Sequence, residues 1–208
     1  KKLVDHHTYV VAGDGCLMEG VSQEAIGLAG RHKLGKLIVF WDNNNITIDG
    51  TVDMTDRTNQ VMRFKASGWH VLEIDGHDPD AIDLAITAAK KSIKPTMIAC
   101  ETHIALGSSA QDTSKGHGAL TDPKLIEDAR KTYGWTAGSF EIPRALKTEW
   151  EAIGKKSIPN RDAWAERLAS LSQNRQNEFE RVYTLEPSRK IKAAVRNLKQ
   201  QISSTAPK

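Results

Sequence analysis

The sequence reads GDGCLMEG at residues 13–20, and a second motif with a cluster of polar residues, DNNNI, follows at residues 42–46. Each motif directly follows a short apolar run that favours a β-strand, at residues 8–12 and 37–41. Between them, residues 22–32 carry small and apolar side chains at helical spacing. The sequence therefore predicts a strand, a helix and a strand, with both motifs at the carboxyl ends of strands.

Continuous apolar strands joined by a helix are typical of a parallel sheet that is buried on both faces, and ligands bind outside the carboxyl edge of such sheets. Mg²⁺ prefers oxygen ligands, of which only one or two are usually carboxylates. Asp14 would supply charge, Asn44 a neutral amide oxygen, and Gly13 and Gly15 a backbone that bends close to a phosphate. Alone, however, Gly-Asp-Gly is usually only a tight turn, and three adjacent asparagines also suit a turn.

Several longer strings resemble the transketolase family of thiamine diphosphate enzymes. They are GDGCLMEG, LAGRHKLGKLI at 28–38, IDG at 48–50, MRF at 62–64, GWHV at 68–71 and IDGHD at 74–78, with looser similarity at 134–135 and 140–143. The resemblance runs from about residue 4 to about residue 120. Gly-Asp-Gly alone also fits pyruvate dehydrogenase E1 and deoxyxylulose phosphate synthase. The tryptophan and histidine strings favour transketolase or its close relative, dihydroxyacetone synthase.

The resemblance implies an α/β fold, with a parallel sheet flanked by helices, that binds the diphosphate half of thiamine diphosphate. It assigns Asp14, Asn44 and the Ile46 carbonyl to Mg²⁺, with Ca²⁺ or Mn²⁺ able to substitute, and the Gly15 amide to the diphosphate. It also places Glu19 in the cofactor site near a dimer interface. A solvated acid in the first turn of a helix is an equal alternative for Glu19.

His117 lies between two glycines in a loop, residues 107–118, that shows no periodicity. A histidine there is solvated by default, although loops of this length in a compact domain tend to be functional or disordered. The resemblance implies a catalytic contact of His117 with the diphosphate and the sugar. The family loop usually carries a proline and a further histidine where Ser109 and Lys115 stand, and His103 occupies a usually aliphatic position. These departures bear on the substrate contacts more than on the metal site.

The rest of the first domain is predicted to hold a helix, a strand, a helix and a strand, at residues 58–66, 69–74, 79–91 and 96–100. Asp78 is the expected N-cap of the second helix, which makes His77 a helix-cap neighbour rather than a ligand. From about residue 121 to 198 the pattern is helical and strongly charged, and Trp135, Trp150 and Trp164 are expected packing anchors. We expect residues 1–138 to belong to the sheet domain and residues 139–208 to form a helical connector toward an absent pyrimidine-binding domain.

Composition indicates an ordinary soluble protein of 208 residues, with 39% hydrophobic and 26% charged residues. A net charge of +3 is too small to favour a nucleic-acid partner, and no apolar run approaches the length of a membrane span. Cys16 and Cys100 provide no disulfide framework. We expect both to be reduced and buried in a cytoplasmic protein.

The expected function is that of transketolase in the pentose phosphate pathway: transfer of a two-carbon ketol unit between sugar phosphates by a homodimer. Dihydroxyacetone synthase and a non-catalytic module for Mg²⁺-diphosphate, or the regulatory half of a split enzyme, are the alternatives. Family subunits are several times longer, and their pyrimidine-activating glutamate belongs to another domain of the partner subunit. We therefore expect the chain alone to be inactive.

Overall fold

The structure is a computed structural model, and it describes residues 2–119 and 121–205. The chain divides into two compact units. One is Asp5–Ser139, and the other is Phe140–Lys208 together with Lys1–Val4. The first unit contains the whole sheet, and the second is helical.

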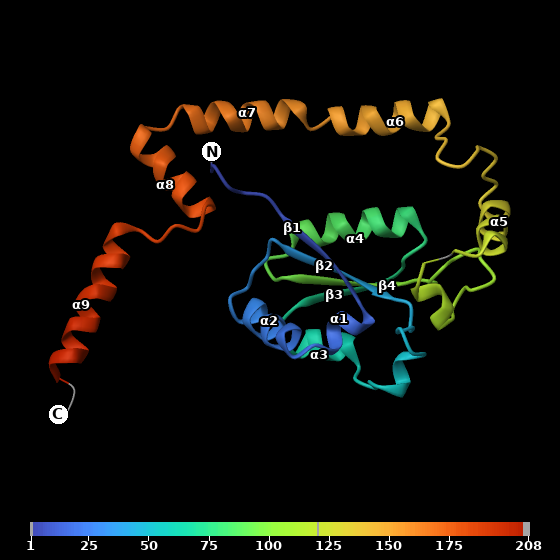
Figure 1. Cartoon of the computed structure of the whole chain (residues 1–208), viewed down its shortest axis with the longest axis horizontal. Coiled ribbons are helices and arrows are strands. Elements are labelled where there is room, and N and C mark those ends of the chain that lie inside the picture. Colours follow the sequence, from blue (N-terminus) through green and yellow to red (C-terminus); the bar gives the residue numbers. More distant parts are fainter. Residues whose placement is uncertain (1, 120, 206–208) are drawn as a thin grey trace. The chain divides into compact units, whose positions relative to one another are not determined.

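The first unit is built on a four-stranded parallel sheet (Figure 1). Its strand order is β1-β2-β4-β3, with β1 at Thr8–Gly13, β2 at Leu37–Asn43, β4 at Thr96–Glu101 and β3 at His70–Asp75. Every neighbouring pair is parallel, so the predicted α/β fold is confirmed. Since Gly13 is in register with Asp42, the two motifs meet at one edge of the sheet.

Helices cover both faces of this sheet (Figure 1). The helices α2 (Gly20–Arg31) and α3 (Gln60–Ala66) contribute Ile26, Ala29 and Phe64 to a core on one face, against Val39, Trp41, Met97 and Ala99. On the other face, α4 (Pro79–Lys91) packs Ala85 and Ala89 against Ile38, Ile98 and Cys100. Burial on both faces explains why the central strands β2 and β4 are mostly apolar. The expected burial is wrong for β1, because this strand lies at the edge of the sheet and leaves Tyr9, Val10 and Val11 exposed.

The first motif does not form the tight turn that Gly-Asp-Gly alone usually indicates. Gly13 is extended, with φ −83° and ψ 178°, and the chain passes from it directly into a short helix, α1, at Asp14–Met18. Neither Gly13 nor Gly15 adopts a positive φ. Thus the turn interpretation is wrong for this stretch, because strand and helix join without a left-handed residue. The helix expected at residues 22–32 begins at Gly20.

Side-chain caps fix the starts of α3 and α4. Asp78 accepts hydrogen bonds from the backbone N–H groups of Asp80, at 2.9 Å, and Ala81, at 3.3 Å. This confirms the predicted cap of α4. Asn59 caps α3 by accepting from the N–H of Met62 at 2.8 Å. This cap was not predicted, and it delays the start of the helix from residue 58 to Gln60.

The remaining elements are short 3₁₀ turns and helices. They are η1 (Val52–Met54), η2 (Ser114–His117), α5 (Pro123–Thr132), α6 (Arg144–Lys155), α7 (Ile158–Ala169), α8 (Gln173–Tyr183) and α9 (Arg189–Thr205). Trp164 donates to the Leu3 carbonyl at 3.0 Å and contacts Phe179, as a packing residue would. Trp150 is 78% exposed, and every residue of α6 is exposed, so that expected anchor is wrong. Among the described residues, none of the helices has the length and apolar character needed to cross a membrane.

Candidate cofactor site

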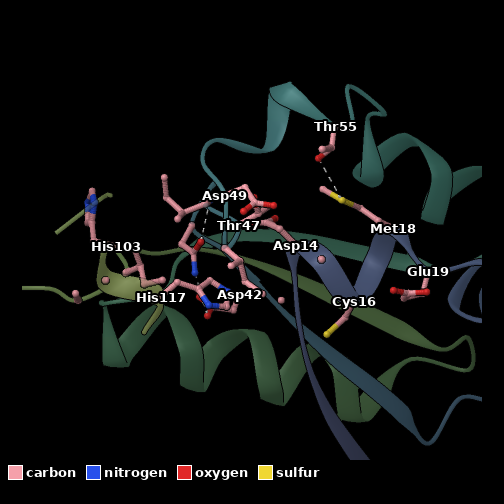
Figure 2. Close-up of a pocket in the computed structure, with 18 residues that line it drawn as sticks. Asp14, Cys16, Met18, Glu19, Asp42, Thr47, Asp49, Thr55, His103 and His117 are labelled. Carbon is pink, nitrogen blue, oxygen red and sulfur yellow. Dashed lines mark hydrogen bonds between the residues drawn. The ribbon is translucent and has the colours of Figure 1, made fainter. Parts of the chain in front are cut away.

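A cavity of about 920 Å³ opens at the carboxyl edge of β1 and β2 (Figure 2). Its walls come from the β1–α1 junction, the end of β2 with the loop after it, and the loop between β4 and α5. The residues that the sequence analysis assigned to the metal, the cofactor or catalysis all line it: Asp14, Gly15, Glu19, Asn44, Ile46 and His117. The structure thus gathers residues more than a hundred positions apart into one cavity.

Asp14 is the buried acid of this cavity, with 6% of its surface exposed. Its Oδ1 accepts a hydrogen bond from Trp41 Nε1 at 2.8 Å, and its Oδ2 accepts one from the Asn45 backbone N–H at 2.8 Å. Burial raises the pKa of Asp14, and these hydrogen bonds offset only part of that rise. A carboxylate with little water around it gains strongly from a cation placed beside it.

Asn44 and Ile46 are brought into the cavity by a tight backbone turn. Asn45, between them, is left-handed with φ 63°. Asn44 Oδ1 accepts a hydrogen bond from the Ile46 N–H at 3.0 Å, which is the geometry of an Asx turn. The asparagine run is therefore a turn and also part of the cavity wall. The two interpretations of this run are compatible.

Asp42 also lines the cavity, although the sequence analysis gave it no role. Its Oδ2 accepts a hydrogen bond from Asn44 Nδ2 at 3.3 Å, and its Oδ1 accepts one from the Thr102 hydroxyl. The Asn44 amide is consequently oriented with its nitrogen toward Asp42. The charge of Asp42 also adds to the rise in the pKa of Asp14. The available sequence signal was that Asp42 opens the DNNNI motif directly after the apolar run at 37–41.

The two histidines of the cavity come from the loop after β4, and they lie at the end opposite Glu19 (Figure 2). His117 is the last residue of η2. Glu19 is exposed at the N-cap position of α2, where its side chain makes no capping hydrogen bond. His103, which the sequence marked only as unusual, joins His117 in the wall.

The two cysteines differ from each other in burial. Cys100 is buried on the sheet, as predicted, and burial raises the pKa of its thiol. Cys16 is exposed and lines the cavity, so its predicted burial is wrong. The cause is the short helix α1, which buries Leu17 and leaves its neighbour facing outward.

The donor set of the cavity suits a hard cation that shares its shell with phosphate and water. No group of three His, Cys, Asp or Glu side chains among the described residues could hold a metal ion by itself. Mg²⁺ needs no such cluster, because one or two carboxylates plus neutral and ligand oxygens suffice. Asp14, Asn44 and the Ile46 carbonyl offer oxygen atoms of these kinds. The residues present therefore fit a magnesium ion that a diphosphate helps to hold.

Comparison with known proteins identifies the family. The sequence of residues 1–187 matches the protein family described as the transketolase thiamine diphosphate binding domain. The chain belongs to this family. It is 52% identical to a transketolase of Rhodobacter capsulatus over 209 residues, which cover 100% of this chain and 31% of that protein. A transketolase of Sinorhizobium medicae is 45% identical over 83% of this chain and 25% of that protein.

Solved transketolase structures share the fold. The Campylobacter jejuni enzyme has a TM-score of 0.79 and 39% sequence identity, over 86% of this chain and 28% of that one. The Pichia stipitis enzyme in complex with sedoheptulose-7-phosphate has a TM-score of 0.79 and 37% identity, over 86% and 28% of the two chains. The resemblance to transketolase is thus confirmed. This chain spans about a third or less of the length of these relatives.

Proposed function

We propose that this chain is the part of a transketolase that holds the Mg²⁺-diphosphate end of thiamine diphosphate. The observation that carries the proposal is the meeting of Asp14, Asn44 and Ile46 in one cavity at the carboxyl ends of two adjacent strands. The family to which the chain belongs is described by its binding of this cofactor. The cavity is therefore assigned to the diphosphate and its metal.

Each wall residue has a role that follows from its chemistry. Asp14 supplies the anionic oxygen of the metal shell, and Asn44 and the Ile46 carbonyl supply neutral ones. The Gly15 amide donates to the diphosphate. An added β-carbon at Gly13 or Gly15 would meet no atom within 4 Å, which supports a wall open to a ligand at this point. Glu19, at the far end, lies near the interface of a homodimer in this proposal.

The cofactor, when bound, supplies the chemistry that moves a two-carbon ketol unit from a ketose phosphate to an aldose phosphate. The chain's own residues position it and stabilise charge. Asp14 and Asn44 fix the metal, and through it the diphosphate, in one place. His117 can donate a proton or a hydrogen bond to an oxygen of the phosphate or of the sugar, where negative charge has to be stabilised.

We infer that the chain acts as part of a longer enzyme, called here the complete enzyme, that contains a pyrimidine-binding domain and works as a homodimer. The share of the relatives' length that it spans supports this inference. Residues 139–208 would then form the connector, and the enzyme would act on sugar phosphates in the cytoplasmic pentose phosphate pathway. The isolated chain would lack the group that activates the pyrimidine ring.

Calorimetric titration of the complete enzyme with thiamine diphosphate in the presence of Mg²⁺ tests the metal assignment. Asp14→Ala should weaken binding at least about tenfold, since it removes a charged contact worth roughly 1.5–3 kcal/mol. Asp49→Ala is the matched control, because Asp49 lines the same cavity and has no assigned role. Equal affinity of the two variants would reject Asp14 as the metal ligand.

A further inference from the structure

The loop between β4 and α5 carries both histidines of the cavity. Within this loop the side chains of His103 and Asp112 form a pair, called here the His103–Asp112 tie. His103 Nδ1 lies 3.0 Å from each carboxylate oxygen of Asp112. A carboxylate accepts hydrogen bonds, so the His103 ring carries a proton on Nδ1. Residues 104–111 therefore form a loop whose two ends are tied together.

His103 is itself anchored to the end of β3. Its backbone N–H donates to His77 Nε2 at 3.0 Å, and the two imidazoles are stacked with centroids 5.7 Å apart and planes at 10°. His77 in turn donates its backbone N–H to Asp75 Oδ1 at 2.8 Å. These hydrogen bonds already use His77 Nε2 and His103 Nδ1. The cluster is thus a chain of hydrogen bonds that leads from the sheet to Asp112.

Asp112, the second residue of the His103–Asp112 tie, is held in place by hydrogen bonds within the loop. Asp112 is left-handed, with φ 56°, and its N–H donates to the Ile104 carbonyl at 3.2 Å. Gln111 Nε2 donates to Asp112 Oδ2 at 3.1 Å, while Gln111 Oε1 accepts from the Gly107 N–H at 2.9 Å. The hydrogen bond from Gln111, followed by that from His103, lowers the pKa of Asp112. The carboxylate is therefore ionised at neutral pH.

The tied loop supports the turn that carries His117. An added β-carbon at Gly116 would lie 2.8 Å from the Ala105 β-carbon and 3.1 Å from the Ala110 carbonyl oxygen. The turn η2 is thus packed tightly on the loop. His103 and His117 lie at the same end of the cavity (Figure 2). A displacement of the loop would consequently displace His117.

The first half of the loop has a second anchor. Thr132 Oγ1 donates to the Gly107 carbonyl at 2.9 Å, and the Tyr133 hydroxyl donates to the Leu106 carbonyl at 2.8 Å. Both donors lie at the end of α5. The second half, which leads into η2, is held at Asp112. The His103–Asp112 tie should therefore affect the position of the residues between Asp112 and His117 most strongly.

We propose that Asp112 and His103 are positioning residues that hold the turn bearing His117 in the cavity. They thereby set where its imidazole meets a bound diphosphate or sugar phosphate, a consequence that rests on the proposed function. Their side chains are 45% and 50% exposed, and exposed ion pairs contribute little to global stability. The pair therefore acts on the position of the loop and hardly on the stability of the fold.

Amide hydrogen exchange of the isolated chain, followed by NMR, tests the tie without any ligand. Asp112→Gly removes the carboxylate and tolerates the positive φ, and His103→Phe keeps an aromatic ring on His77 while removing Nδ1. Either variant should accelerate exchange of the Gly116 amide, which donates to the Thr113 carbonyl at 2.9 Å, about tenfold. Exchange in β4 should stay unchanged.

Two further variants sharpen this measurement. Asp112→Asn keeps an acceptor oxygen and tolerates the left-handed backbone, so it should restore most of the protection. Glu127→Ala removes another exposed ion pair, with Lys131, and should leave Gly116 unaffected. Unchanged Gly116 exchange in Asp112→Gly overturns the proposal. Acceleration throughout β4 also overturns it, because the pair would then support the fold.

Kinetics of the complete enzyme test whether Asp112 acts through His117. Asp112→Gly should lower kcat/KM about tenfold in the wild-type background and leave it unchanged in a His117→Ala background. An equal loss in both backgrounds overturns the positioning role. If the wild-type complete enzyme failed to bind thiamine diphosphate, the proposed function would be rejected, and the exchange measurements would still decide whether the tie holds the loop.

Discussion

Trp41 Nε1 donates a hydrogen bond to Asp14 Oδ1 at 2.8 Å, inside the wall of the cavity. Trp41 is part of the hydrophobic core of the domain, and its indole N–H reaches Asp14 from that core. Core packing therefore fixes the direction of the carboxylate. After burial, this hydrogen bond is the largest influence on the pKa of Asp14, and it opposes the rise.

Trp41→Phe should make cation binding more sensitive to acid. In the proposed site the metal would bind the ionised form of Asp14, whose pKa lies above the ordinary value of 3.8, so affinity should be lost as the pH falls through that raised pKa. Without the indole donor the pKa rises further, and the loss begins at a higher pH. Calorimetric titration of the complete enzyme with Mg²⁺ and thiamine diphosphate at a series of decreasing pH values measures this shift. An identical pH profile for the variant would show that the indole does not tune the acid.

Asp42→Ala should weaken the metal site although Asp42 is not assigned as a ligand. The carboxylate accepts from Asn44 Nδ2, so its removal frees the amide to rotate and to present nitrogen to the cavity. We expect a loss of about tenfold in Mg²⁺-dependent cofactor affinity, comparable to the loss of a hydrogen bond to a charged group. Asp49→Ala again serves as the control from the same wall. Unaltered affinity would mean that the Asx turn alone fixes Asn44.

His117→Ala in the complete enzyme should lower kcat/KM by about 10²–10⁴-fold while leaving cofactor affinity nearly intact. In the proposed site the metal ligands would already fix the diphosphate, so a histidine in the loop should add little to binding in the ground state. Steady-state kinetics and cofactor titration on the same variant provide the measurement. Near-wild-type turnover, or a loss confined to cofactor affinity, would return His117 to the role of a solvated loop residue.

The isolated chain should show no ketol transfer, even with saturating cofactor and Mg²⁺. Its cavity lacks the domain that activates the pyrimidine ring in the proposed complete enzyme. The assay is turnover of xylulose 5-phosphate with ribose 5-phosphate by the purified chain. Measurable turnover would contradict the proposed division of the enzyme.

The parallel sheet and the meeting of the two motifs could be predicted from the sequence, because apolar runs that end in polar motifs indicate parallel strands and their carboxyl edge. The exposure of β1 could not be predicted, because it depends on the place of that strand at the edge of the sheet. The helix α1 could not, since it has five residues and no side-chain cap. Asp42 was missed because its role depends on which way the Asn44 amide points. Likewise, the pairing of His103 with Asp112 depends on how a loop without periodicity folds back on itself. Such properties arise from three-dimensional contacts that spacing does not encode.

Because Cys16 is exposed, its reactivity can be used to measure whether a ligand occupies the cavity. The sequence contains two cysteines, and Cys100 is buried on the sheet. A mild alkylating reagent should therefore modify Cys16 alone in the native protein. Because Cys16 lines the cavity, anything that fills the cavity should slow this reaction. The rate of labelling then measures ligand binding in the isolated chain without an assay of turnover.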